Sequence, residues 1–183
     1  MHGSRSVLIN PTPALTTARL RLDPLAVDDA GQLAAAMADP GLFTFIGGAP
    51  PMVGELRRRV RRYRAGPRTS GEAWHNWAIR LAIAEEDSDH LIGQLQATVR
   101  DVGASAEVAW LVGTPWQGRG YASEAAVALV DWLVRNGARH VIAHIAPGHA
   151  GSGRVATRAG LQPTDVVEGG EVLWTLHVVD REA

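Results

Sequence analysis

The sequence reads Gln117-Gly118-Arg119-Gly120-Tyr121-Ala122 between a strand-like run, 106–112, and a helix-like run, 123–135. The first turn of a helix has unpaired N–H groups, and the helix dipole favours negative charge there. Because glycine adopts dihedral angles that other residues avoid, Gly118 and Gly120 let the backbone approach a phosphate closely. These six residues are therefore predicted to bind a pyrophosphate group.

Two common nucleotide-binding motifs do not fit this stretch. A P-loop needs Lys followed by Ser or Thr after its second glycine, and the sequence contains no Lys. The dinucleotide-binding fingerprint G-x-G-x-x-G needs a third glycine, and Ser123 occupies that position. The pattern that remains is Q-x-x-G-x-A.

This pattern resembles the acetyl-CoA signature of the GNAT superfamily of acyl-CoA N-acyltransferases. The flanking residues Glu107-Val108-Ala109-Trp110-Leu111-Val112, Trp116 and Glu124-Ala125 are similar to the branch typified by the ribosomal-protein N-terminal alanine acetyltransferases. The resemblance covers roughly residues 17–178. It implies an α+β GNAT fold, in which helices flank a mixed, mostly antiparallel central sheet. Two splayed strands, beginning at Glu107 and His140, would hold acetyl-CoA between them.

The composition indicates an ordinary globular protein. A chain of 183 residues suits one domain, and we expect a flexible lead-in over 1–15 and a single N-acetyltransferase domain over 16–183. The net charge of −1 gives no overall attraction to nucleic acid or an anionic membrane. The absence of cysteine excludes disulfides, zinc–thiolate sites and a thiol nucleophile.

The cellular setting is also an expectation from the sequence. The apolar runs are too short to span a membrane, and the N-terminus lacks the apolar region of a signal peptide. We therefore expect a cytoplasmic protein. All 18 basic residues are Arg, which is typical of a GC-rich bacterial genome.

The hydrophobic pattern predicts alternating groups of helices and strands. Helices are expected over 28–37 (capped by Asp28), 53–64, 123–135 and 153–159. Strands are expected over 19–22, 76–84, 91–100, 107–112, 140–146 and 171–178, with the three from 76 to 112 forming an antiparallel meander. Residues 44–51 are predicted to be a loop.

Transfer of an acetyl group from a thioester to an amine needs a base, a donor for the developing oxyanion and a partner for the departing thiolate. The resemblance places Glu107 as the base, acting directly or through a water. Its other interpretation is a solvent-facing charge or a salt-bridge partner. Neighbouring apolar residues are expected to raise the pKa of Glu107. The implied oxyanion donor is a backbone N–H of Leu111 or Val112, on a strand that the resemblance implies is bulged.

A second motif of the family, N-x-x-A/S-x-x-x-Y/L-x-x-x-G-F, aligns with His149, Ser152, Ala156, Gly160 and Leu161. The resemblance places Ser152 near the thiol, whereas Ala156 stands where many relatives carry a Tyr that acts as the general acid. His149 replaces the usual Asn, and it is interpreted as a cofactor ligand, as the acid, or as a solvent-facing histidine. The expected catalytic residues are thus Glu107, Ser152 and His149. The expected cofactor-binding residues are Leu111, Val112, Gln117, Gly118, Arg119, Gly120, Tyr121, Ala122, His149 and Ser152.

Three further side chains, Phe45, Trp74 and His144, are candidates for the acceptor pocket. His140 and His144 share one face of a strand, but a third ligand is not apparent, so we expect no metal. The basic run 57–64 is predicted to lie on a helix. It is interpreted either as a solvated face or as a surface for an acidic partner: ribosomal RNA, an acidic peptide or a carboxylated small substrate.

The predicted function is transfer of the acetyl group of acetyl-CoA to a primary amine by direct attack in a ternary complex. The acceptor would be a protein N-terminus or a small-molecule amine. The alternative is a catalytically weak CoA-binding protein with a regulatory or interaction role. We expect that the protein has no membrane partner and that nucleic acid is not its main partner. We also expect it to be a monomer or a homodimer.

Overall fold

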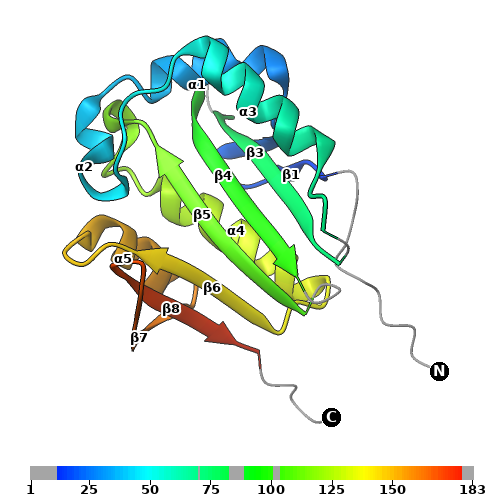
Figure 1. Cartoon of the computed structure of the whole chain (residues 1–183), viewed down its shortest axis with the longest axis vertical. Coiled ribbons are helices and arrows are strands. Elements are labelled where there is room, and N and C mark those ends of the chain that lie inside the picture. The colour runs from blue at the N-terminus through cyan, green and yellow to red at the C-terminus, as the bar shows by residue number, and fades with distance from the viewer. Residues whose placement is uncertain (1–11, 70, 83–88, 101–103, 179–183) are drawn as a thin grey trace.

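A computed structural model describes residues 12–69, 71–82, 89–100 and 104–178 (Figure 1). The strands are β1 (Leu15–Thr16), β2 (Leu20–Pro24), β3 (Ala73–Leu81), β4 (Leu91–Arg100), β5 (Ser105–Val112), β6 (His140–Ile145), β7 (Gln162–Glu168) and β8 (Glu171–His177). The helices are α1 (Ala30–Ala36), α2 (Phe43–Ile46), α3 (Val53–Ala65), α4 (Tyr121–Arg135) and α5 (Ala150–Arg158). Short 3-10 turns are η1 (Val27–Asp29), η2 (Pro40–Leu42) and η4 (Thr114–Trp116).

The strands form one sheet in the order β1-β2-β3-β4-β5-β6-β8-β7. Neighbouring strands pair antiparallel, except for the parallel pair β5–β6. This parallel pairing joins Ser105–Glu107 to His140–Ile142 and goes no further. Beyond Glu107 the two strands diverge (Figure 1). The predicted α+β class, with a mixed, mostly antiparallel sheet flanked by helices, is confirmed.

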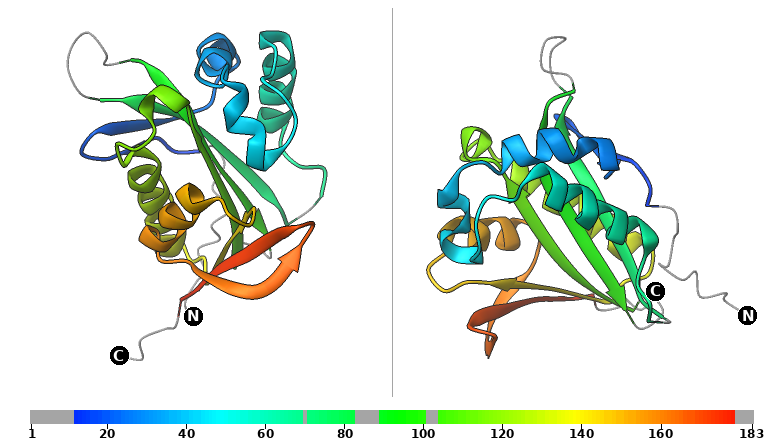
Figure 2. Two further views of the ribbon diagram at one scale, coloured as in Figure 1. Left: turned by 90° about the vertical axis from the view of Figure 1, so that its left-hand side faces the viewer. Right: turned by 45° about the horizontal axis from the view of Figure 1, so that its top comes forward.

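Helices cover both faces of the sheet (Figure 2). On one face α4 packs its apolar side, including Leu129 and Leu133, against Trp77 and Leu95 of the sheet. On the other face α1 and α3 bury Leu56 and Val60, as the spacing in the sequence predicts. Each fully buried side chain of this size contributes about 1.5–3 kcal/mol relative to its exposed state, so both helices are anchored by their apolar stripes.

Four of the differences between the structure and the expected elements have a clear physical reason. Residues 162–168 form β7, which the sequence did not predict. Nearly all of these side chains are exposed, so apolar and polar residues do not alternate as they do in a half-buried strand. The predicted loop over 44–51 begins inside α2. Helix α5 begins at Ala150 rather than 153, because glycines in its first turn weaken the helical signal. The predicted cap at Asp28 is wrong: Asp29 accepts the Ala26 N–H at 2.8 Å.

The expected lead-in lies mostly outside the described residues, and chain pairing has begun by Leu15 in β1. The last residues of the strand expected over 76–84 also lie outside them. None of the helices in the described parts of the chain is both long and apolar enough to cross a membrane.

Candidate active site

The glycine-containing turn joins the end of β5 to the start of α4. Gly118 and Gly120 have φ angles of 74° and 82°, in the left-handed region that favours glycine. Gly120 is the N-cap residue of α4, and no side chain caps this helix. The side chain of Gln117 donates to the Val112 carbonyl at 2.9 Å and ties the turn to the strand. The first-turn amides of α4 therefore remain available to an anion.

A cavity of about 360 Å³ lies at this turn. It is bounded by the end of β5, the turn, the start of α4 and one side of α5, with η2 and α2 contributing Leu42 and Ile46. The structure brings nine of the predicted cofactor-binding residues together around it: Leu111, Val112, Gln117, Gly118, Gly120, Tyr121, Ala122, His149 and Ser152. The tenth, Arg119, does not line it; its carbonyl accepts from Arg19 Nη1 at 3.1 Å.

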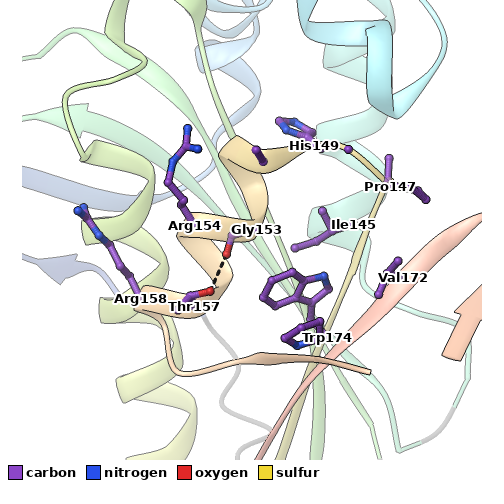
Figure 3. A pocket seen from close by; sticks show the side chains of 13 residues that line it. Ile145, Pro147, His149, Gly153, Arg154, Thr157, Arg158, Val172 and Trp174 are labelled. Carbon is purple, nitrogen blue, oxygen red and sulfur yellow. Dashed lines mark hydrogen bonds between the residues drawn. The ribbon is translucent and has the colours of Figure 1, made fainter. Parts of the chain in front are cut away.

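Guanidinium groups surround the turn. Arg154 and Arg158 of α5 line the cavity, and Figure 3 shows both side chains leaving the helix on the side away from Trp174. A Cβ on Gly120 would lie 3.4 Å from Arg19 Nη2 and 3.9 Å from Arg158 Nη1. Within the described part of the chain, Arg154 and Arg158 pair with no carboxylate. Their positive charge is therefore available to a ligand.

The sequence did not point to Arg19, Arg154 or Arg158. The only local signal was the spacing of Arg154 and Arg158, four residues apart within the second motif. Arg19 is distant in sequence, and only the packing of β2 beside α4 brings it to the turn.

Arg19 is held in place by Glu124. This carboxylate accepts from the Thr17 hydroxyl at 2.6 Å, from the Arg19 N–H at 2.9 Å and from Arg19 Nε at 2.7 Å. Burial acts to raise the pKa of Glu124, but the hydrogen bonds from Thr17 and Arg19 outweigh it, so the pKa lies below its ordinary value. The anionic Glu124 positions the Arg19 guanidinium over the Tyr121 ring, 4.7 Å from its centroid.

His149 is the N-cap residue of α5 and lines the cavity. Its Nδ1 accepts the Ser152 N–H at 3.4 Å, and its ring stacks on Phe45 with centroids 4.4 Å apart. Burial lowers the pKa of His149 by more than a backbone hydrogen bond raises it, so the ring is neutral at neutral pH. With Nδ1 as the acceptor, the neutral ring carries its proton on Nε2, and this N–H can donate to a ligand.

Glu107 lies on β5, four residues before Leu111 and on the same face of the sheet. Arg100 Nη1 donates to Glu107 Oε2 at 3.0 Å, and His144 Nδ1 lies 3.3 Å from Glu107 Oε1. His144 Nε2 in turn lies 3.2 Å from Glu168 Oε2. The apolar surroundings predicted for Glu107 are wrong, because neighbouring strands supply a cation and an imidazole. Glu107 does not line the cavity.

The bulge expected in β5 is also wrong. The register between β4 and β5 runs unbroken from Arg100–Ser105 to Gly93–Val112. A Cβ on Gly93 would lie 2.1 Å from the Leu111 carbonyl oxygen, so the two backbones approach closely there. Free backbone groups arise instead because β5 has no pairing with β6 after Glu107.

The three candidates for the acceptor pocket occupy different places. Phe45 lies beside His149, and His144 lies against Glu107. Trp74 lines a separate hollow of about 430 Å³ beneath the end of α3, where its Nε1 donates to Glu72 at 3.0 Å. It stands two strands from Glu107, because Thr98 is the register partner of both residues. The structure therefore does not bring Trp74 to the cavity.

Two other features lie outside the cavity. An apolar hollow of about 590 Å³ lies on the other side of α5, where Ile145, Val172 and Trp174 line it (Figure 3). The His140 ring stacks on His177, and its Nε2 lies 2.9 Å from the Thr175 hydroxyl. Among the described residues, no group of three or more His, Cys, Asp or Glu is arranged to hold a metal.

Comparison with known proteins agrees with this geometry. The family model of the acetyltransferase (GNAT) domain matches residues 19–162. An acetyltransferase from Agrobacterium tumefaciens is similar in structure, with 28% identity and a TM-score of 0.71 over 93% of this chain and 98% of that one. A GNAT-family acetyltransferase from Bacillus anthracis has 18% identity and a TM-score of 0.72 over 90% and 98%.

The ribosomal L7/L12 α-N-protein acetyltransferase RimL, solved in complex with coenzyme A, has 13% identity and a TM-score of 0.73 over 91% of this chain and 98% of that one. No curated protein gives a significant sequence match. The family model covers most of the chain, and the fold agrees with it. The chain therefore belongs to the GNAT family of acetyltransferases.

Proposed function

We propose that the protein transfers the acetyl group of acetyl-CoA to a primary amine, and that the cavity beside the 117–122 turn holds the cofactor. One observation carries this proposal: the uncapped start of α4 lies among the guanidinium groups of Arg19, Arg154 and Arg158. Coenzyme A has a pyrophosphate and a further phosphate, which suit backbone amides and arginines together. The presence of coenzyme A in the RimL structure supports the same assignment.

The unpaired edge of β5 suits the rest of the cofactor. After Glu107 the backbone groups of β5 on the β6 side have no strand partner, and Leu111 and Val112 line the cavity. We assign the oxyanion donor to a backbone N–H of this segment. The Ser152 hydroxyl can donate to the departing sulfur, and His149, through its Nε2–H, can donate to the pantetheine part of the cofactor.

Glu107 is the proposed base, acting through water. It lies four residues from Leu111, about 13 Å along an extended strand, and this separation favours a bridging water over direct contact with an amine bound beside Leu111. His144 connects Glu107 to Glu168, whose side chain is 61% exposed. A proton that reaches Glu107 can therefore pass through the imidazole to solvent. His149 does not compete for this role, because its Nδ1 is occupied.

An assay of CoA thiol release tests the proposal with two acceptor sets, peptides with a free N-terminus and small primary amines. We expect turnover with at least one set, and Glu107→Gln should lower kcat by roughly 10²–10⁴ with little change in acetyl-CoA affinity. Asp131→Asn, on the exposed side of α4, is the control and should leave kcat unchanged.

The alternative is a catalytically weak CoA-binding protein. It is favoured by the engagement of Glu107 with Arg100 and His144, outside the cavity. Tight CoA binding without thiol release for either acceptor set, or a Glu107→Gln variant as active as the unmodified protein, would support this alternative over the proposed reaction.

A further inference from the structure

The solvent side of α3 consists of arginines. Leu56 and Val60 of this helix are buried. Among its arginines, Arg59 is half-buried and the others are exposed. The six are Arg57, Arg58, Arg59, Arg61, Arg62 and Arg64. Across the described ranges no carboxylate pairs with any of them, although Arg19, Arg21, Arg80, Arg100 and Arg135 each have an acidic partner. The charge of α3 is therefore left uncompensated by the fold.

This arrangement opposes the stability of the helix. Arg57 and Arg61, and Arg58 and Arg62, are four residues apart, and like charges at that spacing destabilise a helix by about 0.2–0.5 kcal/mol per pair. Glu55 is the one acidic residue of α3, and its carboxylate accepts the Met52 N–H. Since the whole chain has a net charge of −1, the positive charge is a local concentration on one element.

Exposed apolar side chains continue this surface toward the cavity. Ile46 and Met52 are 54% and 73% exposed, and Phe45 and Val53 are also exposed. Phe45 stacks on His149, and Ile46 lines the cavity itself. Figure 1 shows α2 and the start of α3 following one another along this side of the molecule. Arginines and apolar residues thus form one surface, the α3 surface, which leads to the proposed site.

We propose that the α3 surface binds an acidic segment with apolar anchors, belonging to a protein that carries the acceptor amine. This inference rests on the proposed function, and it assigns the acceptor to proteins. A helix of 13 residues extends about 20 Å, which is more than a small amine can span. A nucleic acid would match the arginines but offers little to Ile46 and Met52, whereas an acidic protein segment matches both parts.

Binding is tested first, without catalysis. The probes are two fluorescent amphipathic peptides with blocked N-termini and the same leucines. The acidic peptide carries Glu at its polar positions, and the neutral peptide carries Gln at the same positions. Fluorescence anisotropy should show binding of the acidic peptide only, weakening as salt rises. The quadruple variant R57Q/R58Q/R61Q/R62Q should weaken it by about tenfold or more, because each exposed charge pair contributes a modest amount.

Matched variants separate local from general effects. Arg61→Gln and Arg135→Gln change the net charge equally, but Arg135 lies on α4, and only Arg61→Gln should weaken the acidic peptide. The double variant I46S/M52S should weaken the leucine-containing acidic peptide and leave poly-glutamate binding unchanged. A second readout uses the same acidic and neutral sequences with free N-termini as acceptors in the acetylation assay. The KM for the acidic acceptor should be lower than the KM for the neutral one, and kcat should be the same for both.

Three results would overturn the inference: equal or undetectable binding of the acidic and neutral peptides, equal loss in the Arg61→Gln and Arg135→Gln variants, or a uridine-rich RNA that binds more tightly and displaces the peptide. Calorimetry with CoA keeps the two proposals apart. The quadruple variant should bind CoA as the unmodified protein does. If neither protein binds CoA, the proposed function fails, while the peptide result still reports on the α3 surface.

Discussion

His149 shows how one substitution in a motif can keep a structural role and change a chemical one. As the N-cap of α5, its Nδ1 accepts a backbone N–H, which is what the side chain of Asn also does at a helix start. Stacking on Phe45 fixes the ring, and the remaining Nε2–H can donate to the cofactor. The replacement is therefore compatible with the motif.

His149→Ala should raise KM for acetyl-CoA more than it lowers kcat, and it should reduce the free energy of unfolding by about 1 kcal/mol through loss of the cap. His149→Asn should restore the stability. Steady-state kinetics and thermal unfolding measure the two effects. Loss of kcat at an unchanged KM would show instead that His149 is the acid.

His75 gives the fold a dependence on pH. It is buried between Trp77 and Trp132, and burial lowers its pKa from 6.5 to about 4. Between these values the unfolded chain binds a proton that the folded chain does not. Stability is therefore full above pH 6.5 and falls as the pH drops toward 4, by about 3 kcal/mol from this residue.

Chemical unfolding at a series of pH values should show this loss, and His75→Phe should remove most of it. The exposed His90→Gln should keep the full pH dependence. A His75→Phe profile that parallels the unmodified protein would assign the loss to other groups.

Among the elements, those with a strong local signal were predictable. The bounds of β4 agree with the expected 91–100, and α3 and α4 agree within two residues at each end, because apolar periodicity and glycine ends define them. The 117–122 turn was equally local, since its glycines fix its dihedral angles. β7 was not predictable, because it pairs at the sheet edge with exposed side chains.

Parts of the site that depend on neighbouring elements were also hidden. Glu107 was identified, but its partners Arg100 and His144 come from β4 and β6. Arg19 reaches the turn through the packing of β2 beside α4, where Glu124 binds its guanidinium group. Such contacts depend on the register of the sheet and on the packing of the helices, and a local sequence pattern predicts neither.

The arginines of α3 make a prediction about this element alone. Gln is nearly as good a helix former as Arg, and the exposed arginines have no carboxylate partner among the described residues. The quadruple variant R57Q/R58Q/R61Q/R62Q should therefore unfold at the same or a slightly higher temperature at low salt, and the gain should disappear at high salt. A clear drop in the melting temperature would show that these side chains stabilise the fold.

At the scale of the whole molecule, the divergence of β5 and β6 organises the site. One sheet places the open edge of β5, the turn at the start of α4 and the cap of α5 around a single cavity. The α3 surface reaches the same cavity from the other side of the sheet through Phe45 and Ile46. Cofactor and acceptor would thus approach from different sides.

Isothermal titration calorimetry with acetyl-CoA shows whether this cavity holds the cofactor. We predict one binding site per chain in the unmodified protein, which NAD and ATP do not block. The Gly120→Val variant should lose this binding. The φ angle at Gly120 is 82°, which Val does not readily adopt, so the N-terminus of α4 would shift. Gly31→Ala, where a Cβ meets nothing within 4 Å, should bind normally. No detectable binding to the unmodified protein, or equal binding by Gly120→Val, would show that the cavity at the 117–122 turn is not the acetyl-CoA site.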